Sequence, residues 1–279
     1  MVHILTDSVS DLGHELPRKF DIGVIPLSVF VNEQTFIDGG DLTSEMLYAE
    51  VGKSGQLPKT AAPSVAEFIN FFSSYPEDIL FISIGSSLSA TNQNAILAAE
   101  ALPERNIRII DSKNLSTGIG LLVLAAAEKR NQGAALDEIY DCVMSLIPRV
   151  NTSFMIDTLE YLHKGGRCSA MENLMGSLLS IHPIIEVRQD GTLGVRQKLR
   201  GTGKKVMDTM IDGFRQNLDR IDLHRVFITH SGGGIDPFYI KQKLEDIAEI
   251  EEICITQAGA TVSSHCGPKT IGILYIMKE

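Results

Sequence analysis

The chain has 279 residues, and its 25 Lys and Arg against 35 Asp and Glu give a formal net charge of −10. Hydrophobic residues make up 44% of the chain and charged residues 22%, which excludes a disordered chain, a collagen-like chain and a small disulfide scaffold. An acidic chain without a run of Lys and Arg is repelled by phosphate, so we expect no nucleic-acid partner.

The first half of the chain alternates between strand-like and helix-like segments. Strands are expected at residues 2–6, 22–31, 79–84 and 107–110. Helices are expected from Thr43, from the capping box of Ser64 and Glu67, from Ser89 or Thr91, and over residues 117–131. Strands that run into Asp-Ser and then into helical sequence are typical of βα units. The first half is therefore predicted to be an α/β layer fold with a mainly parallel sheet.

The pattern changes after Pro148. Asp190-Gly191 lies between two extended runs, which is a strong signal for an antiparallel hairpin. Further strands are expected at residues 153–156, 225–229, 252–256 and 271–277, and helices at 159–163, 204–218 and 237–247. Since roughly 100–200 residues form one domain, we predict two α/β domains, residues 1–150 and 151–279, the second with a mixed sheet.

The ends of the chain and its apolar runs bear on location. No basic region followed by an apolar one opens the sequence, so no signal peptide is visible. The longest strongly apolar run, residues 119–127, is about half as long as a membrane span. We expect a cytoplasmic protein without stable membrane insertion.

The cysteines give no sign of a metal centre. None of Cys142, Cys168, Cys254 and Cys266 forms a C-x-x-C pair, so we expect neither a metal nor another cofactor. Cys266 is expected in a Gly-rich loop, where its role is packing, with a nucleophile as the alternative.

Small polar residues cluster where the predicted strands of the first half end. These segments are residues 6–8, 59–64, 85–91 and 111–113. Hydroxyls beside helix N-termini attract an anion such as a carboxylate, although each hydroxyl taken singly also suits a cap or a turn. In the second half, His265 is expected on a constrained loop before Pro268, where it could donate a hydrogen bond to an anion or serve only in the structure.

Standard enzyme signatures are missing: the sequence has neither a G-x-S-x-G elbow nor a P-loop. We therefore predict a binding protein and not an enzyme. The alternative is a phosphotransferase or hydrolase acting on a small polar substrate, with Asp7 or Asp111 working beside His265.

Eight short motifs, taken in order, give the chain a resemblance to a known family. They are ILTDSVSDL (4–12), IPL (25–27), KTAAPS (59–64), SSLS (86–89), DSK (111–113), DTLEYLHKGGR (157–167), RGTGKK (200–205) and HCGP (265–268). In their order and spacing they resemble the DegV family of bacterial fatty-acid-binding proteins, nearly from end to end.

The resemblance implies a long-chain fatty acid buried between two α/β domains. Carried over to this sequence, it places the carboxylate against Thr60, Ser89 and His265, and Arg167 and Arg200 at the mouth of the site. In related proteins that region meets a separate kinase, which phosphorylates the bound acid.

The chain departs from the family pattern near the expected head group. Ala61 and Ala62 stand where the family often has Ser-Gln, Ala90 where it often has Gly, and Cys266 where Thr is common. We expect a sparser hydrogen-bond network around the carboxylate than is usual in the family.

Overall fold

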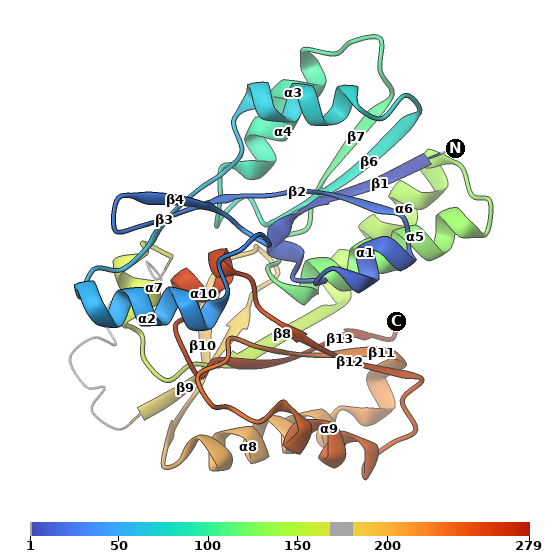
Figure 1. Ribbon diagram of the computed structural model, residues 1–279. Coiled ribbons are helices and arrows are strands. Elements are labelled where there is room, and N and C mark those ends of the chain that lie inside the picture. The colour runs from blue at the N-terminus through green and yellow to red at the C-terminus, as the bar shows by residue number, and fades with distance from the viewer. Residues whose placement is uncertain (1, 168–180) are drawn as a thin grey trace.

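The computed structural model describes residues 2–167 and 181–279. Within these residues the chain forms a four-stranded, a six-stranded and a three-stranded sheet (Figure 1). Helices cover the sheets and also fill the space between the two larger ones. The predicted α/β class, with one parallel and one mixed sheet, is confirmed.

The four-stranded sheet is entirely parallel, in the order β2-β1-β6-β7. Its strands are β1 (Val2–Asp7), β2 (Ile22–Ile25), β6 (Asp78–Ser83) and β7 (Ile107–Asp111). On its outer side lie α3 (Val65–Ser73) and α4 (Thr91–Glu100), where Phe68, Phe72 and Phe81 form a fully buried aromatic cluster. The predicted capping box of Ser64 and Glu67 begins α3.

Helix α5 (Thr117–Asn131) lies between the two larger sheets. It contacts β1 and β6 on one side and β8, β11 and β13 on the other. A helix that is apolar on all sides, as this one is over residues 119–127, has to be buried all round. The largest core cluster accordingly draws side chains from both halves of the chain. Helices α1 (Glu15–Lys19) and α6 (Leu136–Leu146) lie beside it, next to the first sheet.

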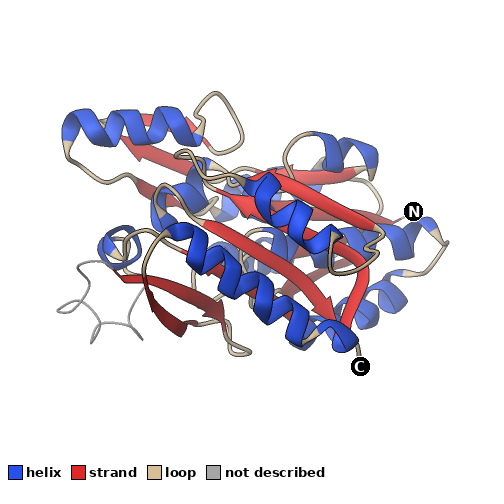
Figure 2. Cartoon of the chain, turned by 90° about the horizontal axis from the view of Figure 1, so that it is seen from below, coloured by secondary structure: helices blue, strands red, loops and turns tan. Residues whose placement is uncertain are grey.

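The six-stranded sheet has the order β10-β9-β8-β13-β11-β12. Its strands are β8 (Val150–Met155), β9 (Ile181–Val187), β10 (Leu193–Arg200), β11 (Ile221–His230), β12 (Glu252–Gln257) and β13 (Ile271–Met277). Only β11 and β12 pair in parallel, and β9 with β10 forms the predicted antiparallel hairpin. Helices α8 (Gly203–Gln216) and α9 (Pro237–Glu245) cover its outer face, as the view from below shows (Figure 2).

The three-stranded sheet corrects one prediction. Residues 22–31 were expected to be one strand, but they form β2 and then β3 (Ser28–Val31), which belong to different sheets. Pro26 lies between them and has no N–H with which to continue a ladder. Strand β3 pairs with β4 (Gln34–Ile37) and with β5 (Lys59–Ala61), and α2 (Ser44–Ser54) packs on this sheet.

Two short helices complete the fold where the halves meet. Helix α10 (Ala260–Cys266) contacts α2, β3 and β5 of the first half and α7 (Glu160–Lys164) of the second. The small sheet of the first half and α7 of the second therefore meet at one seam, although the division into domains at residue 150 stays a prediction. No helix in the described part of the chain is long and apolar enough to cross a membrane.

Candidate ligand-binding site

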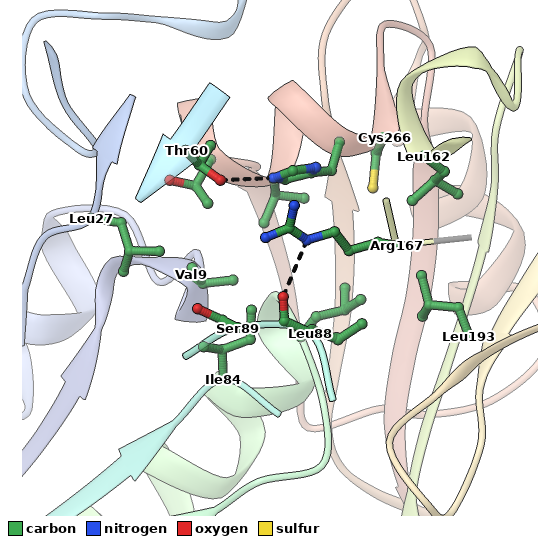
Figure 3. Close-up of a pocket in the computed structure, with 14 residues that line it drawn as sticks. Val9, Leu27, Thr60, Ile84, Leu88, Ser89, Leu162, Arg167, Leu193 and Cys266 are labelled. Carbon is green, nitrogen blue, oxygen red and sulfur yellow. Dashed lines mark hydrogen bonds between the residues drawn. The ribbon is translucent and has the colours of Figure 1, made fainter. Parts of the chain in front are cut away.

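A cavity lies in the seam between the two halves of the chain (Figure 3). It is narrow, with a volume of about 50 Å³. Each half contributes equally to its wall. The first half supplies Val9, Leu27, Thr60, Ile84, Leu88, Ser89 and Leu115, and the second supplies Leu162, Arg167, Leu193, Thr261, Val262, His265 and Cys266. The wall is mostly apolar, with a few polar groups among the aliphatic side chains.

Thr60 and His265 meet across this seam. The Thr60 Oγ1 lies 2.8 Å from the His265 Nε2, so the two side chains form a hydrogen bond between residues 205 positions apart (Figure 3). His265 does not lie on the loop where it was expected. Thr60 is the central residue of β5, which pairs with β3, and His265 is in the last turn of α10. The helix ends one residue later at Cys266, and its C-cap Gly267 has a φ of +76°, which favours glycine.

The environment of His265 keeps its imidazole neutral. Burial, and then the positive charge of Arg167, lower the pKa of His265 to about 4. Its Nδ1 is buried without a hydrogen-bond partner among the described residues and faces the Cα of Gly165. An N–H that points at a glycine Cα would have no acceptor, and a buried donor without an acceptor is rarer in proteins than a buried lone pair without a donor. We therefore assign the proton to Nε2, which donates to Thr60 and leaves the Thr60 hydroxyl hydrogen free.

Ser89 lies in the turn that leads into α4. Its Oγ accepts the N–H of Thr91 at 3.2 Å and lies 2.8 Å from the Thr91 Oγ1. The expectation that this hydroxyl stands at a helix start is correct. Ser89 follows β6 of the four-stranded sheet and Thr60 lies in β5 of the three-stranded sheet, yet both line the cavity.

Arg167 belongs to the wall of the cavity. Its Nε donates to the Leu88 carbonyl at 3.2 Å and its Nη1 to the Gly165 carbonyl at 2.5 Å. The guanidinium thus joins the two halves, and it is half-buried. Burial lowers the pKa of Arg167, but a guanidinium stays charged at neutral pH.

Arg200 was expected with Arg167 at the mouth of the site. It is exposed at the end of β10, opposite Ile181, and does not line the cavity. Its side chain forms no hydrogen bond or ion pair within residues 2–167 and 181–279. The two arginines therefore occupy separate places, one inside the cavity wall and one on the surface.

Comparison with known proteins places the chain in a family. The model described as "Uncharacterised protein, DegV family" matches residues 1–278. The chain belongs to the DegV family. A DegV domain-containing protein of Caldanaerobacter subterraneus is 31% identical over 277 residues, with 98% of each chain covered. Another from Deinococcus radiodurans is 30% identical over 276 residues, covering 98% of this chain and 97% of that protein.

Solved DegV structures share the whole fold. One from Thermus thermophilus, described by its fatty-acid binding, is 27% identical with a TM-score of 0.90 and covers 99% of both chains. DegV from Bacillus subtilis, described as a fatty acid binding protein, is 26% identical with a TM-score of 0.87, again over 99% of each chain.

The structure separates the acids of the alternative enzyme hypothesis from His265. Asp7 is fully buried in this DegV chain, and its two oxygens accept the N–H groups of Val9 and Ile84. Asp111 accepts the N–H groups of Ser86 and Lys113. Neither carboxylate lines the cavity.

Among the described residues, Cys266 is the cysteine that lies at the candidate site. Cys266 lines the cavity, and burial raises the pKa of its thiol to about 12, which makes it a poor nucleophile. Cys168 lies outside the described residues. Within the described ranges, no cluster of three or more His, Cys, Asp and Glu side chains could hold a metal ion.

Sequence reasoning missed Thr261. It lies in α10 four residues before His265 and lines the same cavity. Residues at i and i+4 share one face of a helix, so this spacing would have indicated Thr261 if the segment had been recognised as helical. Because the segment was interpreted as a loop, the spacing carried no meaning.

Proposed function

We propose that this DegV family member binds a long-chain fatty acid in the cavity between its two halves, with the carboxylate at Thr60 and Ser89. The observation that carries the proposal is the composition of the wall. Hydroxyls, a neutral imidazole and one guanidinium interrupt an otherwise aliphatic surface. The printed descriptions of the Thermus thermophilus and Bacillus subtilis structures support the same ligand class.

The aliphatic wall accounts for the affinity. Each methylene removed from water contributes about 0.8 kcal/mol, so an acyl chain of some dozen carbons gains on the order of 10 kcal/mol. Leu27, Ile84 and Leu88 of the first half and Leu162 and Leu193 of the second supply this apolar surface. The head group then needs only a few donors to fix its orientation.

The polar groups form a chain of donors that ends at the ligand. His265 donates from Nε2 to the Thr60 Oγ1, and the Thr60 hydroxyl then donates to a carboxylate oxygen. Ser89, which accepts the Thr91 N–H, turns its own hydrogen to the same group. Arg167 supplies the positive charge that balances the buried carboxylate. His265 acts here as a positioning residue for Thr60.

The finer part of the proposal is that the protein is a carrier in lipid metabolism that presents its acid to a separate fatty-acid kinase. The exposed end of β10 supports it, because Lys198 and Arg200 lie two residues apart on this edge strand and so share a face. A basic edge on a chain of net charge −10 suits an acidic partner surface. We propose no catalysis by this chain, and a cytoplasmic location remains a prediction.

Ligand extraction tests the proposal. Organic extraction of protein made in bacteria, followed by mass spectrometry, should yield fatty acid at near one per chain. Thr60→Val and Ser89→Ala should each weaken fatty-acid binding by about tenfold to a hundredfold, since a hydrogen bond to a charged group is lost. Thr35→Val, on the exposed strand β4 of the same small sheet as Thr60, is the matched control and should bind normally.

Two results would overturn it. One is clean protein that also fails to take up added fatty acid. The other is a Thr60→Val, Ser89→Ala double variant with unchanged affinity, which would remove the assigned head-group site. A nucleotide or a metal ion recovered in the extraction, in place of the lipid, would favour the alternative enzyme.

A further inference from the structure

One hydroxyl in the cavity wall has no hydrogen-bond partner among the described residues. Thr261 is only 4% exposed, and its Oγ1 forms no hydrogen bond with any of residues 2–167 and 181–279. Buried hydroxyls are nearly always hydrogen-bonded, because the group loses its water on burial and recovers nothing if it stays unpaired. A hydroxyl in a cavity wall that lacks a partner within the protein is placed to take one from a ligand.

The other hydroxyls of α10 show why Thr261 is different. Ser264 Oγ donates to the Ala260 carbonyl at 2.7 Å, and Ser263 Oγ donates to the Ala258 carbonyl at 3.4 Å. Both use a backbone carbonyl four or five residues earlier. Thr261 is the second residue of the helix, so four residues earlier lies Gln257, which belongs to β12. The start of the helix thus removes the local acceptor that a helical Thr normally uses.

Thr261 is also held in position. Its backbone N–H donates to Asp38 Oδ1 at 3.2 Å, and the preceding Gly259 N–H donates to Asp11 Oδ1 at 2.8 Å. Two carboxylates from the first half therefore bind the first turn of α10. One turn further along the same helix face, His265 bonds Thr60. The Thr261 hydroxyl is fixed beside the polar part of the wall.

We propose that the Thr261 hydroxyl is a third hydrogen-bond donor to the carboxylate of the bound acid, beside Thr60 and Ser89. This inference rests on the proposed function. An alkyl chain offers no acceptor, so within a fatty acid only the carboxylate can satisfy this hydroxyl. Ala61, Ala62 and Ala90 remove polar side chains near the head group, and Thr261 supplies a donor from the opposite half of the chain.

Thr261→Val separates this role from a structural one, because the two roles predict opposite signs. Valine keeps the shape and removes the hydroxyl. Without ligand, the variant should unfold at a higher temperature than the wild type, since an unpaired buried hydroxyl has been removed. With stearic acid as the probe, it should bind about tenfold or more weakly. Thr261→Ser, which keeps the hydroxyl, should retain most of the affinity.

Thr270→Val is the matched control. Thr270 is also buried, but its Oγ1 donates to the carbonyls of Cys266 and Gly267 at 3.0 and 3.2 Å. Removing that hydroxyl takes this donor from the Cys266 carbonyl, while the Gly267 carbonyl keeps the Ser231 hydroxyl at 2.7 Å. This variant should therefore unfold at a lower temperature and bind stearic acid normally.

Three outcomes overturn the inference, and they differ in meaning. Wild type and Thr261→Val binding stearic acid equally well would show that the hydroxyl does not reach the carboxylate. Tighter stearic acid binding by Thr261→Val, with weaker binding of a hydroxystearic acid, would assign the hydroxyl to an oxygen on the acyl chain. A wild-type protein that binds no fatty acid at all would remove the proposed function itself.

Discussion

Gly165 controls the position of His265. It ends α7 with φ −74°, a conformation that alanine adopts without strain. A Cβ added there would lie 2.4 Å from the His265 Nδ1 and 2.9 Å from the Tyr161 carbonyl oxygen. Gly165→Ala therefore tests mainly the approach of the imidazole to a bare Cα, which is the closer of these two contacts.

The size of the effect follows from how the clash is relieved. Ordinary contacts to a Cβ begin near 3.4 Å, so the ring has to move by about 1 Å. Overpacking a core costs about 1–3 kcal/mol, and we expect the lower end because His265 can move into the cavity. That movement breaks its 2.8 Å bond to Thr60 and fills ligand space, so fatty-acid affinity should fall about tenfold or more.

The assay combines urea unfolding with titration of a fatty acid. Gly213→Ala, in the middle of α8 with nothing within 4 Å of the added Cβ, is the control and should gain about 0.5–1 kcal/mol. Because His265→Ala removes the clashing ring and leaves only the 2.9 Å approach to the Tyr161 carbonyl, Gly165→Ala should cost clearly less in that background. A coupling energy between the two changes close to zero would refute the reasoning.

Two further predictions concern charge. Burial raises the pKa of Asp7 to about 7 and of Asp11 to about 8, so the folded protein binds more protons than the unfolded chain between pH 4 and 8. The contribution of these groups to the free energy of unfolding is complete below pH 4 and is lost as pH rises through 7 to 8. The difference in stability between wild type and Asp11→Asn should therefore change between pH 4 and 8. A difference that stays constant over these pH values would contradict the raised pKa of Asp11. Arg200→Glu should leave fatty-acid binding intact and slow phosphorylation of the bound acid by a kinase partner, whereas equal rates for wild type and variant would exclude the basic edge as a docking site.

Short-range signals in the sequence determined most of the secondary structure. The capping box of Ser64 and Glu67, the Thr43 cap and the Asp190-Gly191 hairpin depend on groups within a few residues of one another. An apolar segment that no polar residue interrupts indicated α5. Such features need no knowledge of the rest of the chain. The motifs that carry the DegV resemblance were equally readable, and they named Thr60, Ser89 and His265.

Long-range contacts decided the rest. The split of residues 22–31 into two strands depends on a sheet that β5 completes some thirty residues later. The sequence could not show that His265 is helical, because α10 is short and is held by Asp11 and Asp38 from the first half. Nor could it show that Arg167 faces the cavity while Arg200 does not.

The cavity itself belongs wholly to the tertiary structure. Seven of its lining residues come from each half of the chain, and its central hydrogen bond joins residues 205 positions apart. A sequence shows that a hydroxyl is present, and the residues next to it show whether the hydroxyl could cap a helix. Whether that hydroxyl is left without a partner, as at Thr261, depends on every group packed around it. The burial of this hydroxyl and its possible partners are both fixed only when the two halves of the chain pack against each other.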